Sequence, residues 1–167
     1  MDFYKVIRKR RSIRGYKSDP VPKAALKRIG EAVQLAPSAC NIQPWKIRIV
    51  VKPELRAEIC AHYTAPWLAE APAIAVVIGN KEECWKRLEG NPIIDIDVGI
   101  VMEHLVLAAT AEGLSTCWIC AYNVPKMNAA LNIIAPWSVL AISPLGYGNA
   151  EPRKLERKPL NDIFEVI

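Results

Sequence analysis

Hydrophobic and polar residues follow one another along the chain in blocks whose spacing predicts helices and strands. In residues 24–36 apolar side chains recur at helical spacing with Lys and Arg between them, which predicts an amphipathic helix that Pro37 ends. Residues 73–79 form an unbroken apolar run that ends in glycine, as in a central strand covered on both faces. Further expected elements are helices over 53–62 and 125–131, strands over 46–51, 114–121 and 139–148, and a short helical or irregular piece over 65–71.

The longest predicted helix covers residues 93–113, and its second half has few polar positions on any side. A helix that is apolar nearly all round must be buried nearly all round. A domain of this size has trouble surrounding such a helix alone, so we expect a homodimer whose interface is built largely on this helix. The stretch is not expected to span a membrane, because polar residues interrupt it at Asp95, Asp97, Glu103 and His104.

The whole chain has the length and composition expected of one domain over residues 1–167. Hydrophobic residues make up 51% of it and charged residues 23%, which is ordinary for a globular protein and makes disorder unexpected. Helices and strands alternate without a regular βαβ rhythm, and there is no internal repeat. The sequence therefore predicts an α+β sandwich around one mixed sheet.

Positive charge gathers at both ends of the chain. Residues 8–16 hold four arginines, a lysine and a serine, and eleven of the 22 Lys and Arg side chains lie within 1–17 and 153–158. An arginine fork grips two phosphate oxygens at once, so the first cluster predicts an anion site. A solvated basic face and a nucleic-acid arm are the alternatives, and the net charge of +5 fits all three. We expect no nucleic-acid partner, because aromatic residues suited to base stacking are not interleaved with these charges.

The five cysteines, at 40, 60, 84, 117 and 120, are an odd number in a chain that begins with charged residues in place of an apolar signal segment. This favours reduced thiols and a cytoplasmic protein. Cys117 and Cys120 match a C-x-x-C spacing, but on the strand expected over 114–121 their side chains point to opposite faces. A zinc or redox site needs converging thiols, so we expect no metal there.

Residues 37–45 are small, polar and held by prolines, as in a rigid binding loop. Taken together, four motifs resemble the nitroreductase family of flavoproteins, in order and over nearly the whole chain. They are Arg10-Arg11-Ser12-Ile13-Arg14, the segment 36–45, Asp97-Val98-Gly99 opening a helix that leads into 113–119, and Leu145-Gly146-Tyr147-Gly148 before Arg157-Lys158-Pro159-Leu160. No single motif is specific, but the series is.

The resemblance implies a three-layer α/β/α fold and FMN bound at the interface of a homodimer, with both subunits lining each of two sites. A cation at the flavin pyrimidine edge would stabilise the negative charge that develops at N1 and O2 on reduction. The implied phosphate residues are Arg10, Arg11, Ser12 and Arg157, and Arg14 reaches the pyrimidine edge. Pro37, Ser38, Ala39 and Asn41 of the partner would contact the ring and ribityl chain, and the backbone amides of Cys120 and Ala121 approach N5.

The function implied is an oxidoreductase in which NAD(P)H gives hydride to flavin N5 and a nitroaromatic, quinone or similar small acceptor then takes it from the same pocket. No catalytic acid is assigned, since Asp95, Asp97 and Tyr122 are candidates only by residue type. Asp97 fits a structural role in the first turn of the long helix. The alternative is a flavin or nucleotide binder without turnover, which would need the same phosphate site. Many relatives carry Gly or Glu in place of Cys120, which leaves the N5 contact open. The chain is also shorter than the larger nitroreductases and lacks room for the helices that cover their substrate channel, which leaves the acceptor open.

Overall fold

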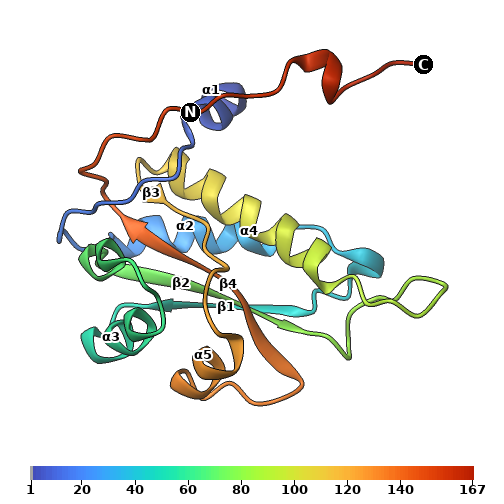
Figure 1. Cartoon of the computed structure of the whole chain (residues 1–167), viewed down its shortest axis with the longest axis horizontal. Coiled ribbons are helices and arrows are strands. Elements are labelled where there is room, and N and C mark those ends of the chain that lie inside the picture. Colours follow the sequence, from blue (N-terminus) through green and yellow to red (C-terminus); the bar gives the residue numbers. More distant parts are fainter. Residues whose placement is uncertain (1) are drawn as a thin grey trace.

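The computed structural model describes residues 2–167 and shows one four-stranded sheet between two layers of helices (Figure 1). The strands are β1 (Trp45–Val50), β2 (Ala73–Asn80), β3 (Ser115–Thr116) and β4 (Trp137–Gly146), in the spatial order β1-β2-β4-β3. Neighbouring strands run antiparallel, and parallel pairing enters through the isolated bridge between Ser12 and Thr116. The α+β fold with its central sheet and helices on both sides is therefore confirmed.

The helices divide between the two faces of the sheet according to the alternation of side chains along β2. Ala73, Ala75 and Val77 share one core with α2 (Lys23–Gln34) and α4 (Ile94–Ala111). Ile74, Val76 and Ile78 point the other way and share a second core with α3 (Pro53–Ala61), the 3-10 turn η2 (Pro66–Glu70) and α5 (Val124–Ala130). All eight residues of β2 are buried, as the unbroken apolar run predicted. Short elements complete the chain: α1 (Phe3–Lys9), η1 (Ala39–Asn41) and η3 (Leu160–Asp162).

Gly79 allows the long helix α4 to begin close to the sheet. A Cβ at this position would lie 2.5 Å from Leu140 Cδ1 and 2.9 Å from Ile94 Cγ1, so the missing side chain lets the first turn of α4 approach the sheet. Gly79 pairs with Trp45, the first residue of β1. The first turn of α4 is thus brought next to the segment that enters β1, which is the predicted binding loop.

The strand predicted over 114–121 is wrong in its extent, because regular pairing ends at Thr116. The chain continues beside β4, but Cys117 N–H donates to Ser143 Oγ at 3.2 Å, and Ile119 forms only an isolated bridge with Ile142. A side-chain acceptor replaces a carbonyl here, which breaks the ladder. The two thiols nevertheless diverge, since Cys117 is buried and Cys120 is exposed. Within residues 2–167 no group of three or more His, Cys, Asp or Glu side chains is placed to hold a metal ion.

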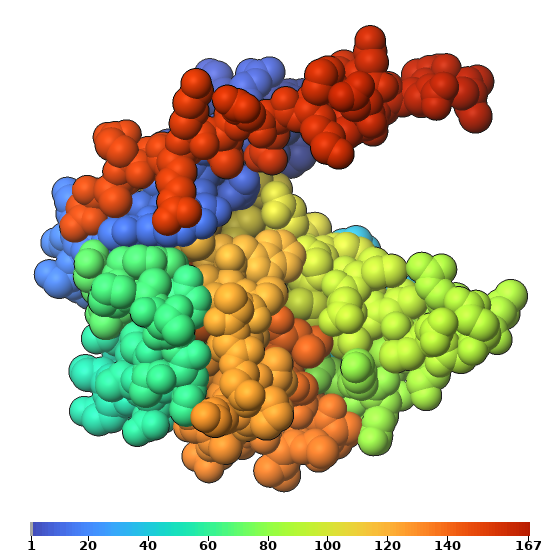
Figure 2. Space-filling view, in the orientation of Figure 1, coloured from blue at the N-terminus to red at the C-terminus, as the bar shows by residue number. Residues whose placement is uncertain are grey.

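The two ends of the chain lie side by side over the α4 layer (Figures 1 and 2). After β4 the C-terminal segment crosses the N-terminal residues and then projects beyond α1, away from the rest of the chain (Figure 2). Its apolar side chains Leu160, Ile163, Phe164, Val166 and Ile167 are all exposed. Among residues 2–167, no helix combines the length and the apolar character that crossing a membrane requires.

Candidate functional site

Residues Arg10–Tyr16, which we call the basic strand, run extended after α1 and are attached to the sheet edge. Ile13 N–H donates to Thr116 O at 2.9 Å, next to the Ser12–Thr116 bridge. Tyr16 is 3% exposed, and its hydroxyl donates back to Ile13 O at 2.8 Å. Its amide donates to Glu70 Oε2 at 3.0 Å. Several independent contacts therefore hold the backbone that carries the arginines.

Alternate side chains of the basic strand point to opposite sides, as in any extended segment. Arg10, Ser12 and Arg14 lie on the side of Cys117. Burial raises the pKa of the Cys117 thiol, and Arg14, Ser12, Arg153 and Arg10 all act against that rise. All four side chains act on this one thiol, so they lie within electrostatic range of it. Three guanidinium groups and a hydroxyl on this side of the sheet edge make a site that suits a multiply charged anion such as phosphate.

Arg11 points to the other side, into a small hollow of about 180 Å³ that Lys9, Thr110 and Ser115 also line. One of its terminal nitrogens donates to the backbone carbonyl of Arg153, and its Nε is buried without a partner among residues 2–167. The structure thus separates Arg11 from Arg10 and Ser12. In this position Arg11 attaches the C-terminal segment to the basic strand.

Arg153 is the cation of this cluster that sequence reasoning missed. It was counted within the basic C-terminal stretch, but the motif resemblance pointed to Arg157, which lies on a fully exposed part of that stretch. Arg153 comes near Arg10 and Arg14 because of the path that the chain takes after β4. No local sequence pattern encodes that path. The one available signal was the gathering of positive charge at both ends of the chain.

The second group of predicted residues lies in the 38–43 loop, which has a strained backbone. Cys40, Asn41 and Gln43 have φ values of 50°, 54° and 54°, in the left-handed region that costs a non-glycine residue about 1–2 kcal/mol. The loop is closed internally by Gln43, whose amide donates to Ser38 Oγ at 2.8 Å and whose side chain donates to Asn41 Oδ1 at 3.0 Å. Strain of this kind persists where the surroundings enforce it, and it is common at ligand sites. Pro37 and Asn41 are exposed, whereas Ser38 and Ala39 are partly buried.

One side chain of α4 reaches this loop. Asp97 is 0% exposed, and its Oδ1 accepts a hydrogen bond from Ala39 N–H at 3.2 Å. Its Oδ2 is buried and has no partner within residues 2–167. The position in the first turn of the helix was expected, but the bond to a residue 58 positions earlier could not be read from the sequence.

The basic strand and the 38–43 loop lie at opposite ends of α4. Asp97, next to the loop, belongs to its first turn, whereas Thr110, next to Arg11, belongs to its last. Thirteen residues separate the two positions, which corresponds to about 20 Å along a helix that rises ~1.5 Å per residue. One chain therefore does not bring Arg10, Ser12 and Arg14 together with residues 37–41.

The residues assigned to flavin N5 follow Cys117 on the exposed side of the sheet edge. Cys120 and Ala121 are both exposed, and Cys120 Sγ accepts from Trp118 Nε1 at 3.3 Å. The neighbouring Tyr122 is partly buried; burial first, and then Cys120, raises the pKa of its phenol. Its hydroxyl has no partner among residues 2–167. A neutral phenol buried in the second core makes Tyr122 unsuited to proton transfer at the surface.

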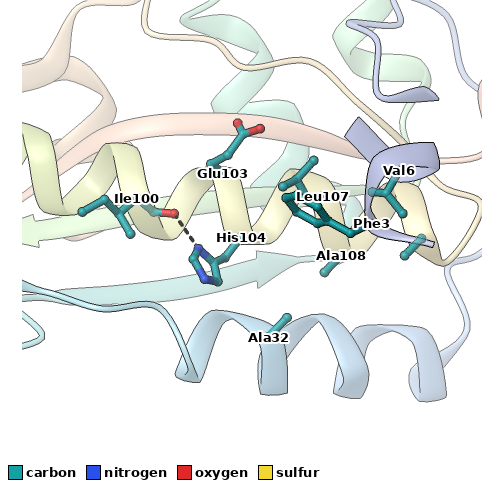
Figure 3. Close-up of a pocket in the computed structure, with 9 residues that line it drawn as sticks. Phe3, Val6, Ala32, Ile100, Glu103, His104, Leu107 and Ala108 are labelled. Atoms are coloured by element: carbon teal, nitrogen blue, oxygen red, sulfur yellow. Dashed lines mark hydrogen bonds between the residues drawn. The ribbon is translucent and has the colours of Figure 1, made fainter. Parts of the chain in front are cut away.

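An apolar groove of about 620 Å³ runs along the outer side of α4, between α1 and α2 (Figure 3). Ile100, Leu107 and Ala108 of α4 are only partly buried there, and Phe3 of α1 is exposed on its rim. His104 Nδ1 lies 3.0 Å from Ile100 O, so the ring is held along the helix (Figure 3). The helix predicted to be covered nearly all round thus keeps one open apolar side within a single chain.

Comparison with known proteins gives the fold a family. The sequence matches the nitroreductase family model over residues 7–63 and 57–147. It is 27% identical to a Thermus thermophilus NADH dehydrogenase (93% of this chain, 91% of the relative) and 34% identical to a 5,6-dimethylbenzimidazole synthase of Rhodobacter capsulatus (91% and 72%). The structure of an FMN-dependent nitroreductase from Clostridium difficile, 26% identical, superposes with a TM-score of 0.80 over 96% of both chains. The chain therefore belongs to the nitroreductase family of oxidoreductases.

Proposed function

We propose that this protein is an FMN-dependent oxidoreductase that takes hydride from NAD(P)H and passes it to a small acceptor such as a nitroaromatic or a quinone. The single observation that carries the proposal is the placement of Arg10, Ser12 and Arg14 on one side of the basic strand, an extended segment attached to β3. A relative named NADH dehydrogenase and a structural neighbour named as FMN-dependent support the choice of cofactor and reductant.

The donor set fits FMN. Arg10 and Ser12 would supply a charged fork and a hydroxyl for the phosphate, with Arg153 as a further cation from the C-terminal segment. Arg14, two residues further along the same side, would supply positive charge for the pyrimidine edge. Bound FMN supplies the hydride-accepting N5 atom, and the protein supplies position, charge and exclusion of water. Arg157 would join the phosphate site only if the C-terminal segment moved toward it.

The proposed site is completed by a second copy of the chain. Residues 37–41 and the basic strand lie at opposite ends of α4, between positions about 20 Å apart along the helix axis, so we assign the loop that would meet the flavin to a partner. The open apolar side of α4 provides a surface for that partner, and burying Ile100 and Leu107 there would stabilise the dimer. The exposed apolar residues of the C-terminal segment, beyond α1, fit a segment that packs on the partner.

The visible spectrum of the purified protein tests the cofactor. We expect the two absorption bands of oxidised flavin, and we expect NADH or NADPH to bleach them without air and a quinone to restore them. If neither nucleotide bleaches the flavin bands, the result would favour the alternative, a flavin-binding protein without turnover. The double variant Arg10→Ala/Ser12→Ala should release FMN, because hydrogen bonds to charged groups contribute about 1.5–3 kcal/mol each. Arg8→Ala, an exposed change at the end of α1, is the matched control and should retain the flavin.

The oligomeric state tests whether a second copy of the chain completes the site. Leu107→Glu places a charge in the middle of the groove, and we expect it to yield a monomer in light scattering with a loss of bound FMN. Lys126→Glu, on α5 at the other face of the sheet, should stay dimeric. A monomeric wild-type protein that still binds FMN would contradict the shared site.

A further inference from the structure

Asp97 is the one charged residue that is fully buried among residues 2–167. A buried carboxylate is unfavourable unless hydrogen bonds and nearby positive ends compensate for lost water. The first turn of α4 gives it a favourable helix dipole, but among residues 2–167 only one hydrogen-bond donor reaches it, the backbone amide of Ala39. An apolar side chain at this position would fill the same space and leave no buried oxygen without a hydrogen-bond partner. What an apolar residue could not do is accept the hydrogen bond from Ala39.

Backbone hydrogen bonds hold the chain on either side of the 38–43 loop, and the bond from Ala39 N–H to Asp97 holds the loop itself to α4. Before the loop, Ala36 N–H donates to Val33 O at 3.1 Å; after it, Asn80 N–H donates to Pro44 O at 2.9 Å. At the end of the loop Trp45 N–H also donates to Gln43 O at 2.8 Å, and the bonds before it join loop residues to one another, as in Asn41 N–H to Ser38 O at 3.0 Å. The left-handed residues Cys40 and Asn41 follow Ala39 directly. Releasing Ala39 would let the strained turn relax away from α4.

We propose that Asp97 is a positioning residue for the flavin: it fixes Ala39 and thereby the left-handed turn that presents Ala39–Asn41 to the cofactor of a second copy. This inference rests on the proposed function, because it needs a flavin at the dimer interface. Asp97 touches neither cofactor nor substrate in this arrangement. It acts through the backbone of Ala39, so its loss should weaken flavin binding and loosen one loop while the basic strand keeps its contacts.

The experiment compares Asp97→Ala with Asp95→Asn, an exposed carboxylate in the same first turn of α4. We expect Asp97→Ala to raise the Kd for FMN about tenfold or more, since it removes a charged acceptor, and to speed hydrogen exchange of the 38–43 amides. Asp95→Asn should change neither. Asp97→Asn keeps a carbonyl acceptor for Ala39 and should recover most of the affinity. Unchanged FMN affinity and unchanged loop exchange in Asp97→Ala would overturn the inference.

A second variant approaches the same bond from the loop, in case Asp97→Ala does not fold. Ala39→Pro removes the N–H donor at the first position of η1, where proline is tolerated, after Ser38 in an extended conformation (φ −139°, ψ 162°) that suits a following proline. We expect the same rise in Kd for FMN, and no additional rise in the Asp97→Ala/Ala39→Pro double variant. Additive effects would contradict a shared bond.

Loop exchange also separates this inference from the proposed function. If the wild-type protein binds no FMN, the proposed function fails, yet the exchange of the 38–43 amides still reports whether Asp97 holds the loop. If FMN binds and Asp97→Ala affects neither the Kd nor the loop, the positioning role alone fails.

Discussion

The basic strand and the 38–43 loop are the two candidate ligand-binding regions, and they are held by different means. The basic strand is attached through backbone bonds to β3, through the buried ring of Tyr16 and through Arg11 to the C-terminal segment. The loop is closed by its own polar groups, and one carboxylate from α4 reaches it. One region therefore has redundant support, whereas the other depends on few contacts. This difference predicts where substitutions act on stability and where they act on a single loop.

Tyr16→Ala should break the support of the basic strand and have the largest effect on stability. Removing a buried aromatic side chain typically lowers the free energy of unfolding by about 3–5 kcal/mol. Urea denaturation measures it, with Tyr16→Phe as the matched control, which loses only the hydroxyl bond to Ile13 O, about 1 kcal/mol. A loss below about 1 kcal/mol for Tyr16→Ala, no larger than the hydroxyl bond alone, would mean that this ring does not hold the strand.

The pH dependence of stability should report on the buried Cys117 thiol, which faces the basic strand. Because burial raises the pKa of Cys117 above its usual value of 9.0, the folded protein keeps the proton at pH values where the unfolded chain has lost it. The folded state then binds more protons, so the free energy of unfolding falls as pH rises through this window, by at most about 1.4 kcal/mol per pH unit for one group. Urea titrations from pH 7 to 10 measure the slope.

The variant Cys117→Ala locates the source of that slope and should reduce it. Burial also raises the pKa of Cys60, which should account for part of what remains. A slope that is unaffected by Cys117→Ala would assign the alkaline loss of stability to other groups.

Cys40→Gly tests the strain in the 38–43 loop. Unlike Tyr16→Ala, it should raise the free energy of unfolding, and by a smaller amount. Glycine adopts φ 50° without the strain of a Cβ, but it adds freedom to the unfolded chain. We expect a net gain in the free energy of unfolding of less than about 1 kcal/mol. A stability loss above that size in thermal or urea unfolding would show that the Cys40 side chain itself supports the loop.

The ion pair between Arg28 of α2 and Glu112 after α4 should give the smallest effect. Its hydrogen bond with Arg28 lowers the pKa of Glu112, so the contribution of this pair to stability is present above the unfolded pKa and is lost as pH falls through the folded one. Arg28 is exposed and Glu112 is partly exposed, so salt screens the pair. Glu112→Gln should flatten the acid side of the stability profile slightly at low salt and hardly at all in 1 M NaCl. A large loss at neutral pH would instead indicate a role in packing.

Elements with a strong local pattern were predictable from the sequence. The buried strand β2, the amphipathic α2 and the long α4 each lie within a few residues of their expected bounds, because hydrophobic spacing and prolines determine them locally. β3 was overestimated, since the end of its pairing is set by Ser143 on a strand 26 residues later. The same limit applies to the site. Arg10, Ser12 and Arg14 share a side because they alternate on one extended segment, whereas Arg153 and the Asp97–Ala39 bond depend on contacts that only the folded chain creates.

The placement of the two candidate regions at opposite ends of α4 has a genetic consequence. Suppose that each pocket combines the basic strand of one copy with the loop of another. A substitution of Arg10 then inactivates one half of a pocket, and a substitution of Asn41 inactivates the other half. Each variant alone would then assemble into dimers with two defective pockets. Co-expressed, the two would form mixed dimers in which one pocket inherits both intact halves, so two inactive alleles could complement each other.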